Sequence, residues 1–270
     1  GTSQAIVLTA GLQPQYKLTS GEHAIAQTIW MTGEAQLAVA MRSGNVRVYS
    51  AKGRFMHDFT TRDTSLTVLA WSARGKLFFA GNSRGRIRAY SKKGRLLSGV
   101  FGHQQAVNSL CVSENGQLLL SASADSTAVL WSSEGEKLVT YAPNYGRVTD
   151  ASFAPGSRLI ATASTDSMIR LWSYKGVLKN RLHGHSHQIN AVGFTPQENY
   201  VFSASNDYTL RLWNTRGTEI ATLHHGLYQH VLDAGFSAAE SKIFTASRDF
   251  MKGKTYLTSW NIGKTYLETM

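Results

Sequence analysis

An aromatic residue recurs through this chain at a fixed interval. It stands at Tyr49, Tyr90, Trp131, Trp172, Trp213 and Trp260, and successive members are separated by 41, 41, 41, 41 and 47 residues. A period of this length is typical of proteins in which one supersecondary unit is repeated and packs on its neighbours. The sequence therefore predicts six similar units in series.

Each unit holds four short apolar runs separated by turn residues. In the fifth unit the runs are Gln188–Phe194, Tyr200–Ala204, Leu210–Trp213 and Glu219–Leu223. The segments between them contain Pro, Asn, Asp and Gly, and helical periodicity is missing. Strand-like runs of about five residues with tight turns predict antiparallel sheets of four strands. Such sheets repeated radially form a β-propeller.

Two stretches share several residue types at the same offsets. Gly102–Trp131 and Gly184–Trp213 both begin with Gly-His, pass through Ser-Ala-Ser, and have an Asp six residues before the final Trp. On these motifs the chain resembles the WD-repeat β-propeller family over nearly its whole length. The sequences of its repeats are similar to those of tandem WD-repeat scaffold and sensor proteins. The resemblance implies an all-β fold in which residues 1–270 form a single propeller domain, expected to be part of a longer chain.

The resemblance also implies a buried hydrogen-bond network that locks each blade, made of His, Ser or Thr, Asp and Trp. It assigns His103, Asp125 and Trp131 to one network with Ser121 or Ser123, and His185, Asp207 and Trp213 to another with Ser203 or Ser205; Asp166 and Trp172 belong to a third. A Ser, His and Asp set also resembles a catalytic triad. Because the set recurs with the blade period, a structural role is favoured, and we expect no catalytic residue and no enzyme.

Other units depart from this pattern. Ser43 and Arg84 stand where the first two units should carry the Asp, and the fourth unit lacks Gly-His. The sixth unit carries an insertion at Arg248–Thr255 that is expected to extend a loop. We expect these units to be stabilised mainly by apolar packing.

The number of blades has two interpretations. Six full sets of four strands are expected from Ala24 to Glu268, and residues 1–20 hold two more runs that resemble a third and a fourth strand. This N-terminal hairpin is either half of a seventh blade, completed by strands from elsewhere, or a closure of a six-bladed ring at Gln15–Thr19. Since exposed strand edges are hazardous, some closure is expected, and we favour the seven-bladed plan.

The charge balance indicates an acidic partner. Lys and Arg number 28 and Asp and Glu 17, which gives a net charge of +11. Basic residues follow the third strand of several units, at Lys52, Arg54, Lys92, Lys93, Arg95, Lys175 and Arg216. A second basic group lies near the turn before the third strand, at Arg42, Arg84, Arg248, Lys252 and Lys254.

Propellers of the family that this chain resembles commonly bind partners on the face that carries the turns of the second group. The resemblance places on that face Arg42, Arg84, Gln105, Tyr145, His187, Asn206, Tyr228 and Arg248. Arg and Tyr are frequent anchors of interfaces. We therefore expect a non-enzymatic scaffold that docks an acidic peptide or partner protein, within a large assembly in some settings. The alternative is a nucleic-acid-binding propeller, whose affinity would fall steeply with salt.

Cofactor, metal and location are each constrained by simple features. His183, His185 and His187 alternate and could meet a metal on one strand face, but His185 already has a place in a blade network, so no metal and no cofactor are expected.

Cys111 is the only cysteine, Asn-x-Ser/Thr is absent, and no apolar run is long enough to span a membrane. These features favour an intracellular location, cytoplasmic or cytoskeletal, without membrane insertion.

Overall fold

The computed structural model describes residues 4–8, 14–19, 24–142, 144–156, 158–197, 199–237 and 241–261. Within these ranges the chain has 25 β-strands and no helix. It divides into two compact units, one formed by residues 1–125 and 129–138 and the other by residues 126–128 and 139–270.

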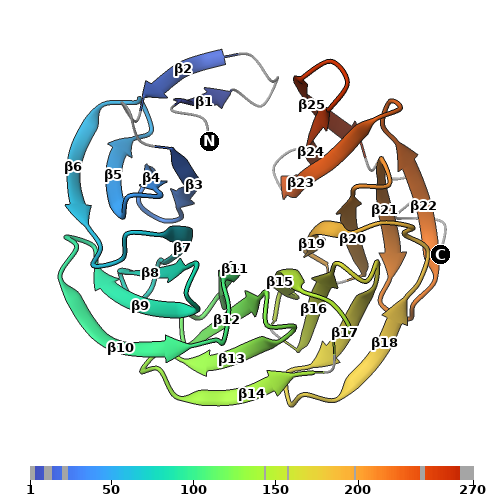
Figure 1. The fold of residues 1–270 in the computed structure, drawn as a ribbon, viewed down its shortest axis with the longest axis horizontal. Helices are drawn as coiled ribbons and strands as arrows, with labels where there is room; N and C mark the ends of the chain where they lie inside the picture. The colour runs from blue at the N-terminus through green and yellow to red at the C-terminus, as the bar shows by residue number, and fades with distance from the viewer. Residues whose placement is uncertain are drawn as a thin grey trace. The chain divides into compact units, whose positions relative to one another are not determined.

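The first unit begins with an antiparallel pair, β1 (Gln4–Leu8) and β2 (Pro14–Thr19). Two four-stranded sheets follow, which we call blades 1 and 2 (Figure 1). Blade 1 consists of β3 (Ile25–Met31), β4 (Gln36–Met41), β5 (Asn45–Ser50) and β6 (Phe55–Thr60). Blade 2 consists of β7 (Leu66–Ser72), β8 (Leu77–Asn82), β9 (Arg86–Ser91) and β10 (Leu96–Gly102). Blade 3 contains residues of both units and consists of β11 (Val107–Val112), β12 (Leu118–Ser123), β13 (Ala128–Ser132) and β14 (Lys137–Tyr141).

The second unit holds blades 4 to 6. Blade 4 consists of β15 (Val148–Phe153), β16 (Leu159–Ser164), β17 (Ile169–Ser173) and β18 (Leu178–Leu182). Blade 5 consists of β19 (Ile189–Phe194), β20 (Tyr200–Ser205), β21 (Thr209–Asn214) and β22 (Glu219–His224). Blade 6 consists of β23 (Gln229–Ser237), β24 (Lys242–Asp249) and β25 (Lys254–Asn261). The predicted all-β fold of antiparallel propeller blades is confirmed, with six blades.

Blade 6 differs from the prediction in two ways. Three strands lie in the described part of the chain, and the fourth strand expected near Glu268 falls outside it. The insertion at residues 248–255 lengthens the hairpin rather than its loop, because β24 and β25 have 8 residues each and the turn between them covers residues 250–253.

The second strands of blades 1 to 5 are buried along nearly their whole length, and apolar side chains pack between neighbouring blades. In the first unit Val48 and Phe59 of blade 1 pack with Phe78 and Tyr90 of blade 2, and the Phe59 and Phe78 ring centroids are 5.3 Å apart. In the second unit Leu171 of blade 4 packs with buried residues of blade 5. Burial of this apolar surface is the main stabilising contribution to the blades.

The pair β1–β2 packs on blade 1 in a similar way. Val7 and Leu18 contact a cluster that includes Leu37 and Tyr49. Val7 and Leu18 lie 41 residues before Val48 and Phe59. By this offset in the sequence β1 and β2 correspond to the third and fourth strands of a blade.

The first strand of each blade carries a β-bulge at the same register. At each bulge the first strand has one extra residue between two residues whose partners on the second strand are adjacent. The extra residues are Ala26, Thr67, Asn108, Thr149, Asn190 and Leu232. A bulge changes which face the following side chains occupy. The residue directly after each bulge is therefore placed differently from what simple alternation along the strand predicts.

Candidate functional site

His185 lies at the centre of a buried hydrogen-bond network in blade 5. Its Nδ1 is 2.7 Å from Asp207 Oδ2, and its Nε2 is 2.7 Å from Ser203 Oγ. The indole Nε1 of Trp213 donates to the same Ser203 Oγ at 2.9 Å. Since an ionised carboxylate only accepts, the Nδ1 N–H of His185 donates to Asp207, and the Nε2 of the neutral ring accepts the hydroxyl proton of Ser203.

Blade 3 repeats this network with His103. Its Nδ1 is 2.9 Å from Asp125 Oδ2, and its Nε2 is 2.6 Å from Ser121 Oγ, which accepts the indole N–H of Trp131 at 2.8 Å. The structure thus selects Ser121, whereas Ser123 bonds the backbone carbonyl of Gln105.

Burial determines what these Ser, His and Asp sets can do. Ser121 and Ser203 are 0% exposed, so no substrate reaches either hydroxyl. Burial lowers the pKa of His103 by more than the neighbouring Asp125 raises it. Burial by itself would raise the pKa of Asp207, but hydrogen bonds from His185 and Thr209 outweigh it and hold that pKa far below its usual range. The folded chain therefore favours the neutral imidazole of His103 and the ionised carboxylate of Asp207.

Blade 4 places an amide where blades 3 and 5 have a histidine. Asn144 Oδ1 accepts the hydroxyl proton of Thr162 at 3.3 Å, and Trp172 Nε1 donates to Thr162 Oγ1 at 3.0 Å. Asp166 pairs instead with Arg170, whose Nη2 lies 2.7 Å from Asp166 Oδ2. Burial opposes ionisation of Asp166, but the Arg170 guanidinium outweighs it and lowers the pKa of that carboxyl.

A partly exposed group of aromatic and basic side chains lies between blades 5 and 6 in the second unit. We call it the aromatic cluster and define it as Tyr208, Tyr228, His230, Phe250 and Arg248. Ring centroids are 6.4 Å apart for Tyr208 and Tyr228, 5.3 Å for Tyr208 and His230, and 4.7 Å for His230 and Phe250. The guanidinium carbon of Arg248 lies 5.3 Å from the Phe250 ring centroid. These contacts form a continuous chain of side chains from one blade to the next.

Comparison with known families assigns the repeats. The model of the WD40 family (WD domain, G-beta repeat) matches residues 94–132, 135–173 and 176–214. The chain is a WD-repeat β-propeller. The three matched repeats contain the tryptophans of the networks in blades 3, 4 and 5. No curated protein matches the chain.

WD-repeat propellers are generally non-catalytic domains that bind proteins. In this WD-repeat chain, all the expected partner-face positions of the second unit adjoin the turn between the second and third strands of a blade. The Tyr145 backbone N–H bonds Asp166, the His187 carbonyl accepts from Ser205, and the Tyr228 carbonyl accepts from the Phe250 backbone. These positions therefore lie at corresponding ends of their blades.

Exposure differs among the expected partner-face residues. Tyr145 is 78% exposed and Tyr228 54%; His187 and Arg248 are also exposed. Asn206 is half-buried, and its Oδ1 accepts from Asn190 Nδ2 at 2.7 Å. The side chain of Asn206 is thus engaged within its blade, and less of it is open to solvent than of the other expected partner-face residues of the second unit.

In the first unit of this WD-repeat chain, Arg42, Arg84 and Gln105 are exposed. Arg84 lines a small pocket of 60 Å³ together with Arg62 and Arg86. One of the basic turns that follow a third strand is partly neutralised, because its Lys92 pairs with Glu34. Glu34 also binds Lys76 of the β7–β8 turn, and the hydrogen bonds from Lys76 and Lys92 lower the pKa of Glu34 to about 2. The positive charge is therefore not equally available on all turns.

Two polar networks of the WD repeats were missed by the sequence analysis. In blade 2, Asp63 accepts from Asn82 Nδ2 at 2.8 Å and from Arg88 Nη1 at 2.6 Å. Asp63 precedes β7, far from the position where the family carries its Asp, so no motif marks it.

Blade 6 has the second missed network. The Nε2 of His225 lies 3.3 Å from Thr245 Oγ1, which accepts the indole N–H of Trp260 at 2.9 Å. Since the spacing from His225 to Trp260 differs from that in blades 3 and 5, the fixed offsets did not identify this set.

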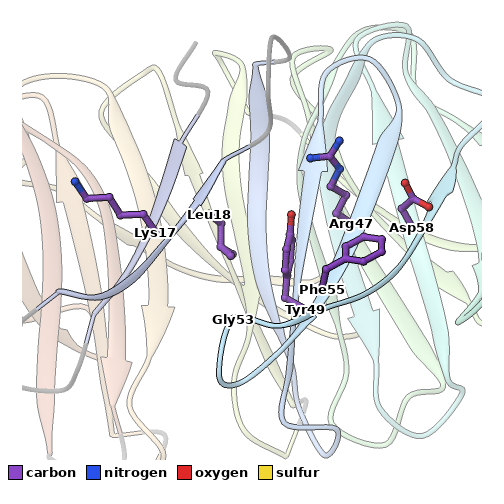
Figure 2. Close-up of a pocket in the computed structure, with 7 residues that line it drawn as sticks. All are labelled: Lys17, Leu18, Arg47, Tyr49, Gly53, Phe55 and Asp58. Carbon is purple, nitrogen blue, oxygen red and sulfur yellow. The ribbon is translucent and has the colours of Figure 1, made fainter.

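A larger pocket of 430 Å³ lies between β2 and blade 1 (Figure 2). Its lining includes Lys17, Leu18, Arg47, Tyr49 and Asp58. Figure 2 shows the charged ends of Lys17 and Arg47 pointing in different directions, and no set of side chains converges on one point. Its mixed lining does not define a chemistry.

Among the residues with described positions, no group of three or more His, Cys, Asp or Glu side chains could hold a metal ion. Gly253-Lys254-Thr255, which resembles the end of a phosphate-binding loop, lies at the turn of the β24–β25 hairpin and is not followed by a helix. No helix in the described ranges is long and apolar enough to cross a membrane.

Proposed function

We propose that this WD-repeat chain is a non-enzymatic docking module that binds an acidic segment of a partner protein at the aromatic cluster. The observation that carries the proposal is the chain of rings between blades 5 and 6, in which Tyr228 and Phe250 are exposed and which ends at the exposed Arg248. Aromatic side chains and Arg are the residue types that most often anchor interfaces.

The cluster is held in place before any partner arrives. Tyr208 and Tyr228 have φ values of +70° and +66°, a conformation that L-residues rarely adopt and that costs free energy unless the surroundings enforce it. Edge contacts between the rings then restrict their rotation. Such preorganisation reduces the entropy lost on binding.

The surroundings of the cluster favour an acidic and partly apolar partner. Leu227 and Met251 are 79% and 76% exposed and extend the apolar surface. Lys252 and Lys254 are exposed on the adjoining hairpin, whose one carboxylate, Asp249, is 2% exposed and lies 3.7 Å from Lys252 Nζ. A peptide that combines carboxylates with an aromatic or aliphatic side chain matches both features.

The proposal extends to the other expected positions. In the second unit Tyr145, His187 and Asn206 would widen the docking surface along blades 4 and 5. In the first unit Arg42, Arg84 and Gln105 would form a contact region of their own. We also propose that residues 1–270 act as one propeller domain on a seven-bladed plan, to which β1 and β2 contribute two strands, and that the protein works inside the cell.

The test is selection of peptides from a random display library on the full chain, followed by affinity measurement with the enriched peptide. We expect enrichment of acidic sequences with an aromatic or leucine residue. Arg248→Glu should weaken binding about tenfold or more, since each 1.4 kcal/mol is tenfold, whereas Arg216→Glu, an identical charge change in an exposed turn after β21, should not. Equal effects of the two substitutions would show that net charge alone drives binding and would refute the site.

Nucleic-acid binding is the second candidate. The exposed arginines Arg62, Arg84 and Arg86 gather around one pocket, and the net charge is +11. A single-stranded RNA probe would then bind with affinity that falls linearly with the logarithm of salt concentration. Binding of the RNA probe, together with no measurable binding of the selected peptides, would favour this candidate.

A further inference from the structure

Two positions that hold the His–Asp pair in blade 3 hold arginines in blade 2. Arg62 stands 41 residues before His103, and Arg84 stands 41 residues before Asp125. In blade 3 the histidine Nδ1 and the carboxylate oxygen are 2.9 Å apart and close a polar network. In blade 2 both arginines are exposed, and neither pairs with a carboxylate in the described part of the chain. Blade 2 thus carries two positive charges where blade 3 carries an internal ion pair or hydrogen bond.

The arginine at position 84 also leaves one backbone donor without its acceptor. In blades 3, 4 and 5 the Asp carboxylate at this position accepts a backbone N–H at 2.9, 3.2 and 3.1 Å, from Gln104, Tyr145 and Ser186 respectively. The equivalent N–H in blade 2 belongs to Asp63, which stands 41 residues before Gln104. This N–H has no hydrogen-bond partner among the described residues. An anion bound here would supply the acceptor that Arg84 cannot.

A small basic pocket lies at this place in the first unit. It has a volume of 60 Å³, and its described lining consists of Arg62, Asp63, Thr64, Ser65, Asn82, Arg84 and Arg86. Asp63 is the one acidic residue of this lining, and its Oδ1 already binds Arg88 Nη1 at 2.6 Å and Asn82 Nδ2 at 2.8 Å. Three guanidinium groups therefore share a space that suits a small anion rather than a nucleobase.

The turn between β8 and β9 fixes the backbone of two of these arginines. Asn82 Oδ1 accepts the N–H groups of Arg84 and Arg86 at 2.9 and 3.0 Å. Gly85 lies between them with φ of +81°, and its carbonyl accepts the N–H of His103 at 2.8 Å. Binding therefore has to order the arginine side chains but not the turn that carries them, which reduces the entropy lost.

The lining favours a phosphoryl group over a carboxylate. A phosphomonoester carries a charge of about −1.5 to −2 at pH 7 and has three strong acceptor oxygens, which can bind several guanidinium groups and a backbone N–H together. The second oxygen of Asp63, Oδ2, is buried and has no hydrogen-bond partner among the described residues. The ionisable O–H of a phosphomonoester is a donor for such an oxygen, whereas an ionised carboxylate or a sulfate ester has none.

We propose that this pocket of blade 2 binds the phosphoryl group of a phosphorylated serine or threonine in a partner protein. The phosphoryl oxygens take the place of the Asp carboxylate of blades 3 to 5, accept the Asp63 N–H and bind Arg62, Arg84 and Arg86. The internal phosphates of a nucleic acid are diesters with a single charge and match this lining less well. The site extends the docking role proposed above to the first unit but does not depend on the aromatic cluster.

The test is an NMR titration of the full ¹⁵N-labelled chain with the end-capped peptide Gly-Gly-phosphoserine-Gly-Gly. Its glycines offer no aromatic, aliphatic or carboxylate side chain to the aromatic cluster. We expect saturable binding, with the amide proton of Asp63 moving downfield as it gains an acceptor. The peptide with unmodified serine and the peptide with O-sulfoserine should each bind at least tenfold more weakly. Inorganic phosphate should compete with the phosphopeptide, but with lower affinity.

Variants of the arginines test the geometry. Arg84→Asp supplies the missing carboxylate from within the blade, so it should abolish binding without lowering the melting temperature. Arg62→Gln and Arg86→Gln, at exposed side chains, should each weaken binding about tenfold or more and keep the test decisive if Arg84→Asp folds poorly. Arg74→Asp is the matched control, because it makes the same charge change at an exposed residue of the β7–β8 turn and should alter the affinity less than twofold.

Arg248→Glu should leave binding of this phosphopeptide unchanged, so failure here is distinguishable from failure of the proposed function. Absence of binding, or an equal loss in Arg74→Asp and Arg84→Asp, overturns the proposal. Equal affinity for the O-sulfoserine peptide would reduce the pocket to a general anion site and also overturn it. Inorganic phosphate that binds as tightly as the phosphopeptide, or a 5′-phosphorylated RNA oligonucleotide that binds more tightly, would assign the pocket to those ligands instead.

Discussion

Arg170 and Asp166 form an ion pair in which the arginine is the buried partner. The two atoms Nη2 and Oδ2 are 2.7 Å apart, and the Arg170 side chain is 1% exposed whereas that of Asp166 is 15% exposed. The guanidinium carbon also lies 5.6 Å from the ring centroid of Tyr145. Because a buried charge without its partner is costly, the free energy of unfolding depends more on Asp166 than a surface ion pair would suggest.

Asp166→Asn is expected to lower the free energy of unfolding by about 3–5 kcal/mol, the usual effect of breaking a buried pair from one side. Arg170→Met combined with Asp166→Asn should recover part of this loss, because the uncompensated charge is then removed. Denaturant unfolding of the single and double variants measures the coupling. Additive effects would show that the pair does not act as a unit.

Trp213→Ala is expected to lower the free energy of unfolding by about 3–5 kcal/mol, as removal of a buried aromatic side chain does. Trp213→Phe keeps much of the packing but leaves Ser203 without its indole donor, so a smaller loss of about 1–3 kcal/mol is expected. Chemical denaturation monitored by circular dichroism compares the two variants. A melting temperature within a degree of wild type for Trp213→Ala would contradict the role of this blade core.

Stability should decrease as pH falls below about 6.5, the pKa of an unperturbed histidine. Burial lowers the pKa of His103 and of His225 in the folded chain. The unfolded chain then takes up protons that the folded chain excludes, so the stabilisation is complete above the unfolded pKa and is lost as pH falls through the folded pKa. The slope is at most about 1.4 kcal/mol per pH unit for each histidine.

Denaturant midpoints at pH values on either side of this range measure the effect. His103→Asn, which copies the amide that blade 4 carries at Asn144, should reduce the slope because one titrating group is gone. An unchanged slope in this variant would exclude His103 as a contributor.

Gly85→Ala should be strongly destabilising. Gly85 has φ of +81°, and an added Cβ would lie 2.2 Å from the backbone oxygen of His103. The clash adds to the cost of about 1–2 kcal/mol for placing an L-residue in this conformation. Gly253→Ala is the matched control, since Gly253 has φ of +65° and nothing within 4 Å of an added Cβ. Thermal melts should show a clearly larger loss at Gly85, and equal losses would mean that the backbone around His103 moves aside.

The repeat period carried most of the fold prediction. The fixed interval between aromatic residues determines the position of each third strand, and the four apolar runs in each unit predict the strand count. The predicted runs of the fifth unit match β19–β22 to within one residue at every end. The network partners of His103 and His185 were implied by the resemblance to the WD-repeat family. The choice of Ser121 over Ser123 was left open, because it depends on which serine faces the indole of Trp131.

The unpredicted parts depend on contacts between blades. Asn144 stands 41 residues before His185, so its place in blade 4 could have been found from the period. Asp63 could not, because it binds Arg88 from a loop position that the repeat does not mark. The bulges depend on strand register, which a pattern within one strand does not contain.

The extended β24–β25 hairpin shows how this architecture accommodates changes in sequence length. Its extra residues continue the pairing of two adjacent strands as far as Asp249 and Lys254, so each added backbone group finds a partner within the same hairpin. Nothing in the pairing of the other blades has to shift, because every blade is built from consecutive strands. Residues inserted in pairs at this hairpin tip would therefore leave all other side chains of the hairpin on the same face of the sheet as before. A single residue inserted within β23 would instead move the side chains of that strand to the opposite face. In this chain the extra length of blade 6 thus lies at the tip of a hairpin, where a longer strand pair also gives a longer arm for reaching another molecule.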